Sequence, residues 1–344
     1  MNGYDRVMKS LRFERVDRAA IIPELIQHNL DIAGETHGRY SNDPNVMCKV
    51  ILAGLKKYET DAVYVSSDNY LIVEAMGGKV MLPGDEPPQL LKTAVSTIEE
   101  AVNLMPLDVN KGRIPVILEA TRMLREILGN EIFVKTCIDA APFSAAASIL
   151  GSQEMLISLI DEPELCHKFL EICTESVVRY GIAAAEAGAH GIAFGDSVAV
   201  LVSKGLYEEF ALPYAQRAIA AIKKETGLPV FYHVCGDTKH ILDLMAQTGA
   251  DCLEIDSKVP MALAKEIVNG RCALEGNVST IEAFYQGTAD DVTREAHAIL
   301  ELFGNRGGVI LSSACEIPRH SPSENVRALT DAVCNYPYQS PSDS

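Results

Sequence analysis

Residues 232–236 place an imidazole and a thiol two positions apart, at His233 and Cys235. On a β-strand, residues i and i+2 point to the same face, so these two side chains can bind one ion together. A second thiol, Cys315, follows the apolar run Val309–Leu311 far along the chain. One imidazole and two thiolates are a ligand set that zinc accepts, and three protein ligands leave a fourth position open for chemistry. The sequence therefore predicts a catalytic zinc site rather than a structural one.

The other cysteines have a simpler explanation, because a buried cysteine behaves as a small apolar residue. They are Cys48, Cys137, Cys166, Cys173, Cys252, Cys272 and Cys334. Nine cysteines spread over 344 residues do not form a disulfide framework and are typical of a reducing compartment.

Eight short runs rich in apolar residues, each ending at a polar residue, predict the strands that would position this site. They are Ala19–Glu24, Ala62–Ser67, Ile132–Asp139, Gly191–Asp196, Pro229–Gly236, Cys252–Ser257, Cys272–Ser279 and Val309–Cys315. Segments of helical period lie between them, among them Tyr207–Lys224, Thr238–Thr248, Ala262–Val268, Ile281–Phe303 and Ser323–Val333. Strands that alternate with helices indicate parallel β/α units.

Eight such units predict an α/β fold, a single (β/α)8 TIM barrel. The domain is expected over residues 1–340, with an N-terminal helical segment (Asp5 to Arg12) and an insertion after the second strand (Asp68 to Asn130). An open, doubly wound sheet is the alternative, and the length alone also allows two domains. The open sheet is disfavoured because residues 24–29, after the first strand, contain no glycine for a nucleotide-binding turn.

Polar residues gather where these strands end, and the active site of an α/β barrel is built at that end. The candidates are Glu24, Asp68, Asp139, Asp196, Glu254, Asp256 and Asn277. Helix capping is the competing explanation for such residues. The fifth and eighth strands are not neighbours in a barrel, so a shared metal requires His233 and Cys235 to meet Cys315 across its mouth.

The charge balance bears on possible partners. The chain has 30 Lys+Arg against 47 Asp+Glu, a formal net charge of −17, which argues against nucleic acid and against an anionic membrane surface. No apolar run approaches the roughly 18 residues of a membrane span, and residues 1–18 do not resemble a secretory signal. A cytoplasmic location is expected.

Several segments together resemble the uroporphyrinogen decarboxylase superfamily, and within it the zinc-dependent corrinoid methyltransferases. They are Phe194–Ser197, Phe210–Tyr214, Phe231–Thr238, Leu274–Ser279, Gly287–Thr288, Ala314–Pro318, Pro322 and Glu324–Asn325. The resemblance runs from Tyr4 to Val333 and is densest after Gly188.

The resemblance implies zinc held by His233, Cys235 and Cys315, with Asp256 as an exchangeable fourth ligand and Glu254 as the alternative. It also implies a cobamide presented by a partner corrinoid protein, and a small methylated substrate. Asp196 is expected to act with Asp256 and Glu254 in catalysis. Glu24, Asp68, Asp139 and Asn277 are expected to bind substrate.

Two directions of methyl transfer are open. Segment 315–319 and the acidic strand ends are similar to members that act on methoxylated compounds, which favours transfer from a methoxylated aromatic donor to cob(I)amide. Transfer from methylcobamide to a thiol of the coenzyme M type is the alternative, although the acidic residues would repel a sulfonate. Porphyrin decarboxylation is disfavoured because residues 21–29 contain no arginine. A non-catalytic corrinoid- or metal-binding accessory protein is the remaining alternative.

Overall fold

The computed structural model describes residues 1–338, in which eight parallel strands form one sheet in the order β1-β10-β9-β8-β7-β6-β5-β2. Their bounds are β1 (Ala20–Ile21), β2 (Ala62–Val65), β5 (Phe133–Ala140), β6 (Gly191–Gly195), β7 (Val230–Val234), β8 (Cys252–Ile255), β9 (Ala273–Val278) and β10 (Val309–Ser313). Each falls within, or within one residue of, a predicted run. The predicted (β/α)8 barrel is confirmed.

Asp61 joins the two ends of this sheet. Its backbone N–H donates to the Ile21 carbonyl at 3.0 Å, and its carboxylate accepts from the Ile21 N–H at 3.0 Å. Arg6 and Arg18 also pair with this carboxylate, which is almost fully buried. β1 and β2 are thereby held together, and the sheet curls into a nearly closed barrel.

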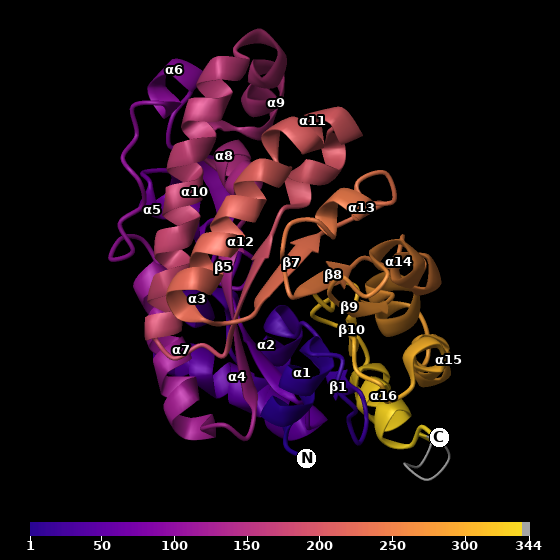
Figure 1. The fold of residues 1–344 in the computed structure, drawn as a ribbon. Helices are drawn as coiled ribbons and strands as arrows, with labels where there is room; N and C mark the ends of the chain where they lie inside the picture. Colours follow the sequence, from indigo (N-terminus) through magenta and orange to yellow (C-terminus); the bar gives the residue numbers. More distant parts are fainter. Residues whose placement is uncertain (339–344) are drawn as a thin grey trace.

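Helices surround the strands, and α10 and α12 pack side by side along the sheet (Figure 1). Their bounds are α1 (Gly3–Leu11), α2 (Ile26–Ala33), α3 (His37–Asn42), α4 (Pro44–Tyr58), α5 (Leu71–Ala75), α6 (Ile98–Ala101), α7 (Ile114–Leu128), α8 (Pro142–Leu150), α9 (Ser152–Asp161), α10 (Pro163–Glu186), α11 (Lys204–Phe210), α12 (Leu212–Thr226), α13 (Leu242–Met245), α14 (Met261–Val268), α15 (Ala289–Phe303) and α16 (Ser323–Cys334), with short helical segments η1 (Ser197–Leu201) and η2 (Thr280–Tyr285).

The N-terminal helix α1 lies at the amino ends of the strands and contacts β1, β2, β5 and β10. Its Val7 is fully buried in an apolar cluster with Ile22, Phe133 and Phe231. The predicted N-terminal segment therefore plugs one end of the barrel. The opposite end, where the strands finish, is left for the site.

The insertion after β2 contains α5, a hairpin of β3 (Lys79–Met81) and β4 (Gln89–Lys92), and α6. Helix α7 also falls in the predicted range, but it packs on β2, β5 and α4 as a regular barrel helix does. The extra structure therefore ends before α7, and the insertion is shorter than predicted.

Two predicted helices are interrupted. Residues 281–303 divide into η2 and α15, because Thr288 begins α15 with a capping box in which its side chain and that of Asp291 bond reciprocally to backbone N–H groups. Residues 207–224 divide at Ala211, between α11 and α12.

Within residues 1–338, no single helix has the length and apolar composition needed to cross a membrane. α8 and α9 meet that criterion only as a pair, and they are bent by 108° relative to each other. The cytoplasmic location stays a prediction. So do the domain bounds of residues 1–340, of which the last two lie outside the described residues.

Candidate active site

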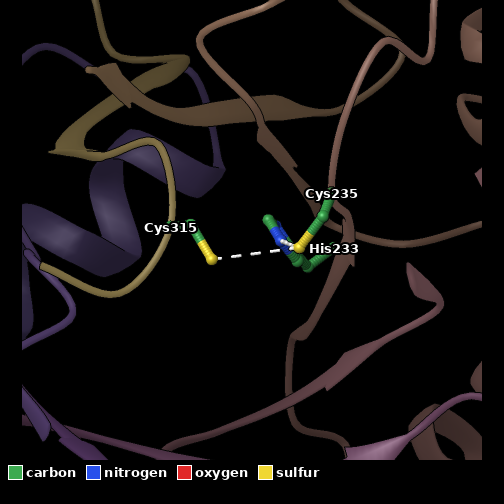
Figure 2. Close-up of side chains that lie close together, drawn as sticks. All are labelled: His233, Cys235 and Cys315. Carbon is green, nitrogen blue, oxygen red and sulfur yellow. Dashed lines mark hydrogen bonds between the residues drawn. The ribbon is translucent and has the colours of Figure 1, made fainter. Parts of the chain in front are cut away.

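The barrel brings His233, Cys235 and Cys315 together (Figure 2). His233 lies near the end of β7, Cys235 directly follows that strand, and Cys315 lies in the loop after β10. The Nε2 atom of His233 lies 2.7 Å from the Cys235 sulfur, and the two sulfurs are 3.9 Å apart. One ligand atom from each residue lies within 4.8 Å of the others. These three side chains could hold one metal ion.

The turn after Cys235 fixes the position of its thiol. Gly236 has φ +94°, a conformation that residues with a Cβ rarely adopt. Its N–H donates to Asp256 at 2.8 Å, and the other oxygen of Asp256 accepts the Lys258 N–H at 2.9 Å. Both oxygens of Asp256 are therefore engaged by backbone, and this carboxylate anchors the loop that carries Cys235.

The pKa values of the three side chains are shifted in different directions. The hydrogen bond with Cys315 and the charge of His233 outweigh burial and lower the pKa of Cys235 to about 3. Burial alone would lower the pKa of His233, but the charges of Cys235 and Glu254 raise it to about 10. The bond with Cys235 and burial raise the pKa of Cys315. The charge of His233 favours a thiolate in this pair of cysteines, and Ser197 donates a hydrogen bond to the Cys235 sulfur at 3.5 Å.

The other ring nitrogen of His233 faces a buried charge cluster. Its Nδ1 lies 3.6 Å from Glu254, whose second oxygen forms an ion pair with Lys135 at 2.6 Å. Lys135 also donates to Glu275 at 2.8 Å. Lys135 has no exposed surface, and both glutamates are buried. A carboxylate on this side of the ring is the arrangement that orients metal-binding histidines in proteins.

A cavity of about 270 Å³ opens beside the three side chains. Three of the predicted substrate-binding residues, Glu24, Asp68 and Asp139, line it together with His233, Cys235 and Cys315. A bulge in β5 falls between Cys137 and Ala140, and Asp139 there has φ +71°. Bulges bend a strand and redirect its side chains, which explains how Asp139 reaches the cavity wall.

The three carboxylates differ in their partners. Asp68 accepts hydrogen bonds from both terminal nitrogens of Arg113, which neutralises its charge. The carboxylate of Glu24 accepts no hydrogen bond from residues 1–338; burial and then the charge of Glu254 raise its pKa to about 8. Burial raises the pKa of Asp139 to about 7, although one oxygen accepts the Ile72 N–H at 2.8 Å.

The remaining predicted residues do not line this cavity. Asp196 is fully buried and accepts hydrogen bonds from the Ser144 N–H and hydroxyl and from the Tyr232 hydroxyl, at 2.7 to 2.9 Å. The amide of Asn277 donates to the carbonyls of Asp256 and Val259. Both side chains hold the strand ends in place.

The sequence reasoning missed Lys135, Glu275 and Ser197. A signal existed for two of them, because a lysine and a glutamate stand inside apolar strands that are buried on both faces, and such residues are almost never buried without a partner. The role of Ser197 beside Cys235 had no signal in the sequence, because its position depends on how η1 follows β6.

The profile of the uroporphyrinogen decarboxylase (URO-D) family matches residues 2–336, almost the whole chain. The chain belongs to the uroporphyrinogen decarboxylase family. Among curated members, it is 28% identical to the methylcobamide:CoM methyltransferase MtbA of Methanosarcina acetivorans, over 97% of this chain and 98% of that protein. It is also 28% identical to the uroporphyrinogen decarboxylase of Paraburkholderia phytofirmans, over 85% and 82% of the two chains.

Among solved structures of the family, a methyltransferase from Methanosarcina mazei superposes with a TM-score of 0.89 at 26% identity, covering 97% of this chain and 98% of that one. These matches confirm the predicted family and its methyltransferase branch.

Proposed function

We propose that this protein transfers a methyl group between the cobamide of a corrinoid protein and a small thiol, with zinc held by His233, Cys235 and Cys315. The spacing of the two sulfurs fits that ion, and the His233–Cys235 hydrogen bond of 2.7 Å would have to open to roughly 3.5 Å to admit it. Zn–S bonds of about 2.3 Å in a tetrahedral site put two sulfurs roughly 3.8 Å apart, and the sulfurs of Cys235 and Cys315 are 3.9 Å apart. The unpaired Nδ1 of His233 faces Glu254, as expected of a histidine that binds metal through Nε2.

The proposed reaction moves methyl from methylcob(III)amide to sulfur. The thiol sulfur supplies the electron pair of the new S–C bond, the Co–C bond breaks with its electrons left on cobalt, and the thiol proton passes to solvent. When bound, zinc would lower the pKa of the thiol and hold it as a thiolate beside the methyl group.

The chain's own residues prepare this site. Glu254 orients the His233 ring, and Asp256 holds the turn that carries Cys235. Ile26, Tyr64 and Pro88 contribute apolar surface to the cavity wall. Such surface excludes water, and it leaves the substrate thiol as the available nucleophile.

Porphyrin decarboxylation is disfavoured, although the uroporphyrinogen decarboxylase of Paraburkholderia phytofirmans and the MtbA protein are both 28% identical to this chain. A substrate with many carboxylates needs cationic partners. Among the described residues, the cavity lining includes no lysine or arginine.

The sequence favoured transfer from a methoxylated aromatic donor to cob(I)amide. The named relatives do not support that donor, since the MtbA protein is a methylcobamide:CoM methyltransferase. One experiment separates the two directions. Purified protein loaded with zinc should consume methylcobalamin only when a small thiol is added, measured by the corrinoid absorption spectrum. Methylation of cob(I)alamin by a methoxylated aromatic compound, with no demethylation by thiols, would contradict the proposal.

Asp256 gives a second test of the site. Replacing it by alanine frees the Gly236 N–H and loosens the loop that carries Cys235, so zinc affinity should fall about tenfold or more. The measurement is competition for zinc with a chromogenic chelator. Asp237→Ala is the control, since this exposed neighbour bonds only within its own loop. If both variants retained zinc equally well, Asp256 would not support the metal site.

A further inference from the structure

We infer that the thiol substrate carries a positively charged group, an ammonium, rather than the sulfonate of coenzyme M. The inference rests on the proposed function and concerns the part of the substrate that lies away from sulfur. It comes from the unpaired carboxylates that line the cavity next to the three metal-binding side chains.

Glu24 is the first of these groups. Its side chain is only 9% exposed, it lines the cavity with Cys235 and Cys315, and no described residue donates a hydrogen bond to its carboxylate. Lys135, the cation of the barrel interior, is already paired with Glu254 and Glu275. Burial disfavours the charged form of Glu24 and raises its pKa, so a cation in the cavity would favour the carboxylate over the neutral acid.

Asp139 is the second. It is 5% exposed and lines the same cavity, and one of its oxygens has no hydrogen-bond partner. The bulge in β5 turns it into the cavity. Glu316 adds a third acid to the wall, and one of its oxygens accepts the Gln27 N–H at 2.8 Å.

Among the described residues, the lining of this cavity holds no lysine or arginine to offset these acids, and its charged base is His233, a proposed metal ligand. His37 is the basic side chain of the lining besides His233, and burial lowers its pKa, which disfavours its charged form. Arg113, the nearby guanidinium, is occupied by Asp68 and Glu74. Tyr64 and Tyr70 complete the wall, and aromatic rings attract cations. A sulfonate would find no lysine or arginine to bind, whereas an ammonium would find the Glu24 and Asp139 carboxylates without a cationic hydrogen-bond partner among residues 1–338.

Three thiols that share a two-carbon chain test this inference: cysteamine, 2-mercaptoethanol and coenzyme M, which end in a cation, a neutral group and an anion. In methylcobalamin demethylation, cysteamine should have a kcat/KM at least about tenfold above that of coenzyme M, with 2-mercaptoethanol between them. In Glu24→Gln the ratio of kcat/KM for cysteamine to that for coenzyme M should fall several-fold. Comparing this ratio between the variant and the wild type also cancels the intrinsic reactivity of each thiol. The control is Glu266→Gln, an exposed glutamate of α14.

Binding gives a readout that does not need turnover. Isothermal titration calorimetry of the zinc-loaded protein with the S-methylated forms of the same thiols should rank them in the same order. Equal or tighter binding of S-methyl coenzyme M would overturn the inference, as would an unchanged ratio in both Glu24→Gln and Asp139→Asn. If S-methyl cysteamine binds most tightly but no thiol demethylates methylcobalamin, the proposed function is wrong and the inferred preference for a cation is still supported.

Discussion

Replacing Cys315 by alanine should abolish thiol-dependent demethylation of methylcobalamin and leave the purified protein with little zinc. Changes in residues that only support a metal ligand cost about 10- to 100-fold in affinity, so losing a ligand should cost at least a hundredfold. The remaining pair, His233 and Cys235, can still form its direct hydrogen bond but offers only two ligands. Elemental analysis of protein purified without added metal measures the zinc, expected at about one per chain in the wild type.

The fold of this variant should survive. Cys315 lies in the loop after β10, and its side-chain sulfur contacts the site rather than the apolar core. The stability of the metal-free protein should therefore fall by about 1 kcal/mol at most. Cys334→Ala, at an exposed position in α16, is the control that removes a thiol and should keep full zinc content. Full zinc occupancy in Cys315→Ala would show that Cys315 is not the third ligand.

The strands could be predicted because parallel strands buried on both faces read as short apolar runs, and because each run here ends at a polar residue. β9 is an example: all six of its residues are buried, and Ser279 follows it. The helices were less accessible to prediction. The break between η2 and α15 depends on a cap at Thr288, which competes with a helical pattern that continues through it.

The site could be predicted in part. The spacing of His233 and Cys235 places both at the end of one strand, and barrel closure accounts for the approach of Cys315. The sequence could not tell which strand-end acids face the cavity. Asp196 and Asp139 look alike in the sequence, yet the first is bonded to Ser144 and the second is turned into the cavity by a bulge.

The sequence also did not predict the charge cluster of Lys135, Glu254 and Glu275 next to His233, because its members come from three strands. Lys135 lies on β5, Glu254 on β8 and Glu275 on β9, and they meet inside the barrel. The ammonium group of the lysine is held by ion pairs and hydrogen bonds with the two glutamates: burial lowers its pKa, and the two glutamates more than offset that effect. Its ammonium group also lies 4.6 Å from the ring centre of Phe231.

Lys135→Met should therefore lower the free energy of unfolding by about 3–5 kcal/mol, since removing one partner leaves buried carboxylates without compensation. Urea denaturation of the wild type and the variant measures this. Lys223→Met is the control: Lys223 pairs with Asp251 at a part-exposed position, and the same substitution there should cost less than about 1 kcal/mol.

The triple variant Lys135→Met/Glu254→Gln/Glu275→Gln separates charge from packing. Neutralising the two carboxylates removes the repulsion that the single variant creates, and methionine fills most of the space of the lysine stem. Most of the lost stability should return, because a neutral replacement of a buried ion cluster is often tolerated. Zinc affinity should be lower than in the wild type, since the glutamine at position 254 is a weaker acceptor for the His233 ring. If the triple variant were as unstable as Lys135→Met, packing of the lysine stem rather than charge pairing would account for the loss.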